Sequence, residues 1–168
     1  MKRAWIGLGS NLGAPERQVD HALRALSLLA RSRLVAASSL YRSLPWGDPD
    51  QDDYVNAVAA LDTRLPPRVL MEQLLRIEAE HGRDRSAQRP NGPRTLDLDL
   101  LLYGEEHYRL PDLTLPHPRL HERAFVLLPL AELAPELPIP GHGNVKSLLK
   151  PEFASLCWRL PESGASLR

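Results

Sequence analysis

The sequence predicts an α+β fold of the ferredoxin-like kind, in which helices pack on a sheet rich in antiparallel strands and C-terminal additions follow. Three observations predict it. Four short segments read as strands, two longer segments repeat apolar residues at helical spacing, and the six follow the order β-α-β-β-α-β. Prolines then gather at 111–118 and 129–140, where we expect ordered but irregular connections and no long helices.

The first half of the chain predicts three strands and one helix. Residues 4–8 form the first predicted strand, which runs into a turn rich in glycine. Pro15 suits the first turn of a helix, and the apolar spacing continues that helix to about residue 31. Segments 34–41 and 54–63 are the second and third strands. One face of the third is expected to carry Val55, Ala57, Ala59 and Leu61.

The second half supplies a helix and the last strand of the predicted sheet. This helix begins at Pro66-Pro67, and Gly82 is a suitable stop. The strand that contains Asp97 and Asp99 comes fourth. Following the chain direction through the six elements places the start of this strand at one edge of the sheet, together with the connections 9–14, 42–53 and 82–94. Two of these connections are long enough to close over a substrate.

Two acidic residues interrupt the apolar fourth strand. Asp97 and Asp99 stand two residues apart and so share one face, while the other face is expected to carry Leu96, Leu98, Leu100 and Leu102. Like charges on one face repel each other unless a cation lies between them. Carboxylate oxygens, completed by phosphate, are typical ligands of Mg²⁺. The alternative is the solvated face of an amphipathic strand.

Basic residues surround this acidic pair, although the whole chain carries 21 Lys and Arg against 21 Asp and Glu. Arginine predominates among them, and its planar guanidinium suits bidentate contact with phosphate oxygens. We therefore favour an anionic phosphate substrate over a set of exposed ion pairs. These residues are Arg83, Arg85, Arg89, Arg94, His117, Arg119, His121 and Arg123.

Length and composition are those of one ordinary globular domain. The 168 residues can bury a real core, and we expect a single domain over 1–160 with a frayed tail at 161–168. The single Cys157 excludes an internal disulfide and a cysteine-based zinc site. No apolar run is long enough for a membrane span or signal peptide, so we expect a cytoplasmic monomer without a membrane partner. Zero net charge argues against a nucleic-acid-coating protein.

Tyr54 and Asn56 share one face of the third predicted strand. An aromatic ring beside an amide suits a flat heteroaromatic ligand, by stacking and by hydrogen bonding. For Phe125 taken alone, core packing is the favoured interpretation. The turn with Gly7, Gly9 and Gly13 matches neither a dinucleotide fingerprint nor a P-loop, and we interpret it as structural.

Several segments together resemble the 6-hydroxymethyl-7,8-dihydropterin pyrophosphokinase family. The resemblance covers about residues 4–140, in order and with compatible spacing. It implies transfer of pyrophosphate from ATP to the hydroxymethyl oxygen of the pterin, with release of AMP, in folate biosynthesis. The segments that carry it are 9–13, 53–57, 83–89, 93–99, 115–119 and 122–125.

The resemblance also implies roles for individual residues. Asp97 and Asp99 would hold two Mg²⁺ ions, and Arg83 and Arg94 would steady the transferring group. The residues implied to contact ATP are Arg85, Arg89, Leu100, Thr114, His117 and Arg123. Those implied to form the pterin pocket are Ser43, Leu44, Trp46, Tyr54, Asn56 and Phe125, with Tyr54 and Phe125 on the two sides of the ring.

Three positions depart from the pattern of some family members. Pro90-Asn91 stands where some members place a tryptophan, Asp112 replaces a basic residue, and Pro118 replaces a tyrosine. Two other functions stay open from the residues alone. One is a ferredoxin-like nucleic-acid-binding module, although no basic-Gly-aromatic strand segment is present. The other is a two-metal phosphohydrolase that cleaves ATP without an acceptor.

Overall fold

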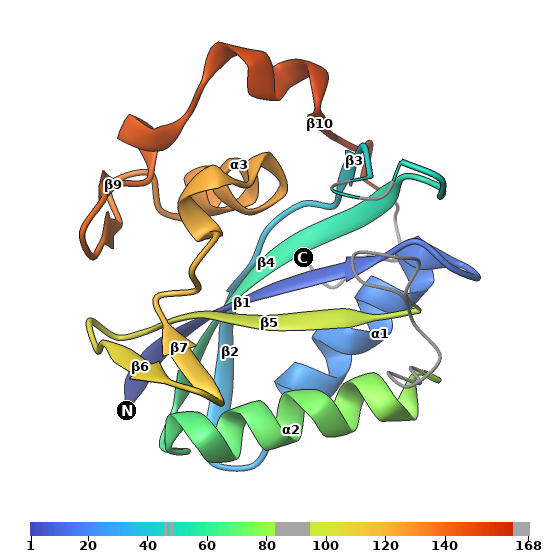
Figure 1. The fold of residues 1–168 in the computed structure, drawn as a ribbon. Coiled ribbons are helices and arrows are strands. Elements are labelled where there is room, and N and C mark those ends of the chain that lie inside the picture. Colours follow the sequence, from blue (N-terminus) through green and yellow to red (C-terminus); the bar gives the residue numbers. More distant parts are fainter. Residues whose placement is uncertain (46, 48, 83–94, 163–168) are drawn as a thin grey trace.

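The computed structural model describes residues 1–45, 47, 49–82 and 95–162 (Figure 1). Its centre is an antiparallel sheet of six strands in the order β10-β3-β4-β1-β5, with β2 also paired to β4. The order of the core strands agrees with the predicted ferredoxin-like arrangement. The strands are β1 (Lys2–Ser10), β2 (Ser32–Ala37), β3 (Tyr41–Ser43), β4 (Tyr54–Thr63), β5 (Asp97–Tyr103) and β10 (Cys157–Arg159).

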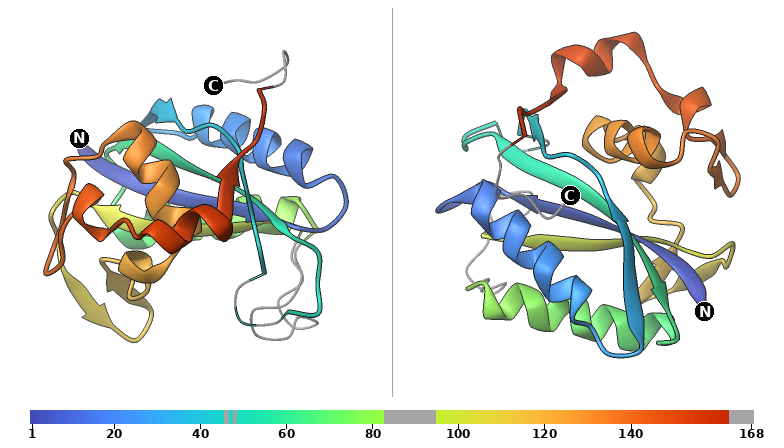
Figure 2. Two further views of the ribbon diagram at one scale, coloured as in Figure 1. Left: turned by 90° about the horizontal axis from the view of Figure 1, so that it is seen from above. Right: turned by 180° about the vertical axis from the view of Figure 1, so that it is seen from behind.

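Helices cover both faces of the sheet (Figures 1 and 2). On one face lie α1 (Pro15–Ser27) and α2 (Pro67–Glu80), whose apolar stripes pack with Ile6 and Leu8 of β1 in one core. On the other lies α3 (Ala124–Leu133), which packs in a second core with Trp5 and Val58. Alternation along β1 and β4 therefore supplies residues to two cores.

Most predicted boundaries are close to the observed ones, but the first strand and the first helix end at other residues than predicted. The third predicted strand coincides with β4, and Val55, Ala57, Ala59 and Leu61 all pack in the first core, as expected. The first strand continues through Ser10, so Gly7 and Gly9 lie inside it and do not form a turn. Helix α1 ends at Ser27 and not near residue 31, and Arg31 itself adopts φ 55°, outside the helical region.

The second predicted strand, 34–41, is divided into β2 and β3. The division falls at Ser38, whose N–H donates to the carbonyl of Val58 at 2.8 Å and whose hydroxyl accepts the N–H of Val58 at 2.9 Å. A side-chain oxygen thus takes the place of a backbone carbonyl in the ladder with β4. Both halves keep their pairing with β4.

A bulge in β5 changes the face of one predicted residue. Trp5 pairs with Leu102 while its neighbour Ile6 pairs with Leu100, so Leu101 is an extra residue. Leu96, Leu98 and Leu100 pack in the first core as expected. Leu102 packs in the second core with Leu101, so its predicted face is wrong.

The C-terminal additions include one helix that was not predicted. Pro129 lies inside α3, so the interpretation of 129–140 as irregular is wrong for residues 129–133. The described residues contain no helix long and apolar enough to span a bilayer. The remaining elements are β6 (Tyr108–Leu110), β7 (Leu113–Leu115), β8 (Pro138–Ile139), β9 (Gly143–Asn144) and the 3-10 turns η2 (Leu120–Glu122), η3 (Lys146–Leu148) and η4 (Pro151–Ser155).

Candidate active site

A pocket opens between the sheet and the start of α3, and we call it the central pocket. Strands β1, β3, β4 and β5 and helix α3 all contribute to it. Both Asp97 and Asp99 line it, so the prediction that they share a face at the site is consistent with the fold. Its lining is Gly7, Leu8, Gly9, Ser43, Leu44, Tyr54, Asn56, Ala57, Asp97, Asp99, Arg123, Phe125 and Val126.

Five of the six residues implied to contact pterin line this pocket: Ser43, Leu44, Tyr54, Asn56 and Phe125. The pairing of β3 with β4 explains their proximity, because Ser43 lies opposite Tyr54. The sixth, Trp46, lies outside the described residues. Phe125 faces both this pocket and the second core, so it serves packing and the pocket together.

Asn56 is held in one orientation by its neighbours. The hydroxyl of Ser43 donates to the amide oxygen of Asn56 at 2.6 Å, and both side chains are buried. An amide whose oxygen already accepts a bond retains its N–H groups as donors toward a ligand. The neighbour Gly9 makes room for this amide, because a Cβ there would lie 3.1 Å from the Asn56 nitrogen.

Arg123 lies beside the acidic pair. Its Nη1 atom is 3.7 Å from Oδ2 of Asp99, and its guanidinium carbon is 5.4 Å from the centre of the Phe125 ring. Burial lowers the pKa of Arg123, while the charges of Asp99 and Asp97 raise it. The arrangement places one cation between two carboxylates and an aromatic face, where it can contact an anionic ligand.

A second pocket, the lateral pocket, lies on the outer side of β5. It contains three of the residues implied to contact ATP, namely Leu100, Thr114 and His117. Asp99 lines this pocket as well as the central one, so the two pockets share that residue. Asp112 and Pro118, two of the departures from the family pattern, also line it, and Asp112 accepts a bond from Arg68 at 3.0 Å.

His117 is fixed and uncharged at neutral pH. Its backbone N–H donates to the carbonyl of Leu101 at 2.9 Å, and its Nδ1 accepts the N–H of Arg119 at 3.2 Å. Burial lowers the pKa of His117 to about 4, with a further lowering by Arg123 and an opposing effect of Asp97. The neutral ring therefore carries its proton on Nε2, which can donate to a ligand.

Arg83, Arg85, Arg89 and Arg94 lie outside the described residues. Among the residues that are described, no three His, Cys, Asp or Glu side chains form a group that could hold a metal ion. Asp97 and Asp99 are two carboxylates on one pocket, a donor set that suits Mg²⁺ when phosphate oxygens and water complete its shell.

The sequence of this chain matches one family of known proteins. The sequence model of 7,8-dihydro-6-hydroxymethylpterin-pyrophosphokinase (HPPK) matches residues 5–135. This chain belongs to the HPPK family. It is 49% identical over 154 residues to the 2-amino-4-hydroxy-6-hydroxymethyldihydropteridine pyrophosphokinase of Haemophilus influenzae, covering 92% of this chain and 94% of that one. It is 50% identical over 149 residues to the enzyme of the same name from Pseudomonas aeruginosa, covering 89% and 91%.

Solved structures share the fold of this HPPK-family chain. The crystal structure of wild-type Plasmodium falciparum HPPK-DHPS with pteroate aligns with a TM-score of 0.70 at 12% sequence identity. The alignment covers 88% of this chain and 41% of that one. At such low identity the likeness supports the ferredoxin-like HPPK fold alone. The family match is what supports the pyrophosphokinase reading over the nucleic-acid-binding and phosphohydrolase alternatives.

Two residues near the HPPK-family site escaped the sequence analysis. Glu78 of α2 is 2% exposed and accepts the N–H of Leu98 at 2.7 Å, between the two aspartates of β5. The sequence indicates that Glu78 is buried, because it continues the apolar stripe of Leu70 and Leu74 at helical spacing. The other is Gly9, which lies inside β1 and not in the predicted turn. A glycine inside a strand indicates a close approach by a neighbouring group.

Proposed function

We propose that this chain transfers the pyrophosphoryl group of ATP to the hydroxymethyl oxygen of 6-hydroxymethyl-7,8-dihydropterin and releases AMP, as a step in folate biosynthesis. The observation that carries the proposal is the meeting of the central and lateral pockets at Asp99. A transferase needs its donor and acceptor held side by side, because positioning converts a two-molecule reaction into one within a complex.

The central pocket is proposed to bind the pterin. Tyr54 and Phe125 can stack on a flat ring, and the fixed amide of Asn56 can hydrogen-bond to the polar edge of that ring. Ser43 supports this amide, and Leu44 adds apolar contact. Trp46 is proposed to complete the pocket on the basis of the family pattern.

The lateral pocket is proposed to bind the adenosine part of ATP. The family pattern implies that the backbone of Leu100 contacts the adenine, while Thr114 and the neutral ring of His117 offer hydrogen bonds. Arg123 lies at the boundary with the central pocket, where the phosphates would lie. The family pattern adds Arg85 and Arg89 as ATP contacts, and Arg83 and Arg94 as residues that steady the transferring group.

Asp97 and Asp99 are proposed to hold two Mg²⁺ ions. Bound magnesium neutralises triphosphate charge and lowers the pKa of a coordinated hydroxyl. The chain supplies a rigid support for these carboxylates, because β5 is paired to β1 on one side and Glu78 accepts the N–H of Leu98 on the other. Arg123 balances the charge of Asp99.

Substitution of the two aspartates tests this proposal. Asp97→Asn and Asp99→Asn keep the side-chain shape but remove the charges. Each is expected to reduce acceptor-dependent AMP release on the order of a thousandfold, because metal stabilisation of transition-state charge is worth several kcal/mol. The assay measures AMP with and without the reduced pterin. Asp62→Asn, on the distant end of β4, is the control and should keep its turnover.

Each contrary outcome points to a different function. Full turnover of either substituted chain would exclude the metal role. ATP consumption that does not depend on pterin would indicate a phosphohydrolase. Tight oligonucleotide binding that weakens with salt, in place of transfer, would indicate the nucleic-acid-binding module.

A further inference from the structure

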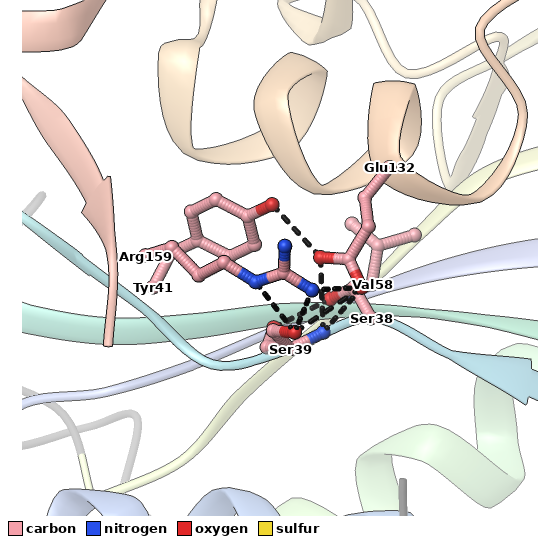
Figure 3. Close-up of polar contacts among 6 residues, drawn as sticks. All are labelled: Ser38, Ser39, Tyr41, Val58, Glu132 and Arg159. Carbon is pink, nitrogen blue, oxygen red and sulfur yellow. Dashed lines mark hydrogen bonds and ion pairs between the residues drawn. The ribbon is translucent and has the colours of Figure 1, made fainter. Parts of the chain in front are cut away.

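A cluster of polar side chains joins the C-terminal strand to the rest of the fold (Figure 3). We call it the Glu132 cluster, and it comprises Ser39, Tyr41, Glu132 and Arg159. Glu132 lies in the last turn of α3, Ser39 lies just before β3 and Tyr41 begins it, and Arg159 ends β10. Three segments far apart in the sequence therefore meet at one carboxylate.

Every bond in the Glu132 cluster converges on the carboxylate or on Ser39. The carboxylate accepts the Ser39 N–H at 3.0 and 3.1 Å, the Ser39 hydroxyl at 3.2 Å and the Tyr41 hydroxyl at 2.8 Å. Nη2 of Arg159 lies 3.2 Å from it. Arg159 also donates twice to the Ser39 hydroxyl, from Nε at 2.8 Å and from Nη2 at 2.6 Å.

The members of the Glu132 cluster differ in exposure. The side chain of Arg159 is 55% exposed, and that of Glu132 is 21% exposed. An exposed ion pair contributes little by itself. Bonds from neutral donors to a part-buried carboxylate are charge-assisted and stronger. Burial and Glu132 both raise the pKa of Tyr41, which therefore remains a donor. Glu132 should matter more than Arg159.

Two walls of the central pocket depend on the elements that this cluster joins. Cys157 of β10 pairs with Ser43, and the N–H of Leu44 donates to the carbonyl of Leu156 at 3.0 Å, so the C-terminal strand supports β3 beside the pocket. The opposite wall is the first turn of α3, which carries Phe125. Glu132 is in the last turn of the same helix.

We propose that Glu132 and Arg159 are positioning residues for the acceptor, because they hold β3, β10 and α3 at the separation that the central pocket requires. The proposal rests on the proposed function and extends it to a segment that contacts neither pocket. It assigns a role to the C-terminal strand: that strand sets the affinity for the pterin and leaves nucleotide binding to β5 and the lateral pocket.

The test measures both affinities in variants of the full chain. In Glu132→Gln, one acceptor oxygen becomes an amide donor that faces the donors of Ser39 and Tyr41. We expect Kd and KM for 6-hydroxymethyl-7,8-dihydropterin to rise about tenfold, equivalent to one lost charge-assisted bond, with values for ATP changed less than about twofold. Arg159→Ala should give a smaller change in the same direction, about threefold. Pterin binding is titrated in the presence of a non-hydrolysable ATP analogue.

The matched control is Glu136→Gln. Glu136 also pairs with a cation of the C-terminal segment, Lys146, at 2.5 Å, but this exposed pair does not contact β3. It should leave both affinities unchanged. The double variant of Glu132 and Arg159 should weaken pterin binding little more than Glu132→Gln alone, because residues of one network are not additive.

Two outcomes would overturn the proposal. One is an unchanged pterin affinity in both Glu132→Gln and Arg159→Ala. The other is an equal loss of pterin and nucleotide affinity, which would indicate a general structural role. If Glu132→Gln fails to fold, Arg159→Ala carries the test. Pterin-dependent AMP release by the unaltered chain is measured alongside, and its absence would contradict the proposed function and not the role of the cluster.

Discussion

At the scale of single residues, the environment of His117 determines what the ring can do. An exposed histidine is partly charged near neutral pH, with an ordinary pKa of about 6.5. Burial and the nearby Arg123 lower the pKa of His117 to about 4. The charge that an exposed histidine would carry is therefore absent at neutral pH, and the ring acts as a hydrogen-bond donor.

This lowered pKa makes stability depend on pH. Between about pH 6.5 and pH 4 the unfolded chain binds more protons at His117 than the folded chain, so the free energy of unfolding falls as pH falls through that window. The loss attributable to His117 is at most about 3 kcal/mol, and solvent exposure of the ring reduces it. Urea unfolding of the unaltered chain and of His117→Gln, at pH 7 and pH 5 without magnesium, should show a shallower decline in the variant.

The ring itself can be observed in the same pH range. An NMR titration should place the midpoint of His117 well below those of exposed histidines. A midpoint near 6.5 would show that the ring is not shielded from solvent.

At the scale of elements, the sheet edge formed by β3 and β10 joins two segments that lie far apart in the sequence. Strand β3 has only three residues, and β10 covers its outer side with another three. Such short strands form few backbone hydrogen bonds with each other. The Glu132 cluster adds further bonds between them, as do the N–H groups of Leu44 and Leu160, which donate to the carbonyls of Leu156 and Leu40. The local stability of this edge should be lower than that of β1 and β4.

Cys157 reports the opening of this edge. It is the single cysteine, it is 2% exposed, and burial raises its thiol pKa to about 12. At pH 8 a disulfide reagent should label the folded chain more than about a hundredfold slower than the urea-unfolded chain, because β10 must first detach. Arg159→Ala should accelerate labelling, and Glu136→Gln should not. Labelling of the folded chain as fast as the unfolded one would contradict the burial of Cys157.

At the scale of the whole molecule, one sheet is shared by two cores. Ile6 and Ala59 point into the first core, whereas Trp5 and Val58, their neighbours in β1 and β4, point into the second. Loss of either core would expose one face of the same strands. We therefore propose that residues 1–160 behave as one domain.

Cooperative unfolding tests this proposal. Far-UV circular dichroism follows all the helices, whereas tryptophan fluorescence responds to Trp5 in the second core. The two urea transitions should coincide and fit a two-state model. A fluorescence midpoint clearly below the dichroism midpoint would show that α3 and the C-terminal additions unfold as a separate unit.

Local patterns were sufficient where structure depends on neighbours in sequence. The alternation in 54–63 predicted β4 with its observed bounds, and Pro67 and Gly82 bracketed α2. The pair Asp97 and Asp99 marked the pocket because residues two apart in a strand share a face. The two carboxylates therefore line one pocket, as their spacing predicted.

Tertiary contacts decided the features that depend on distant residues. Ser38 divides β2 from β3 by bonding to Val58, and the register against Trp5 makes Leu101 a bulge. The prolines at 129–140 indicated irregular structure, but α3 accommodates Pro129, and its mostly apolar segment has no polar face from which a helical period can be read. The Glu132 cluster likewise joins residues that local patterns cannot relate. Local periodicity therefore determined the elements of this protein and its acidic pair, whereas packing between remote segments determined the walls of its pockets.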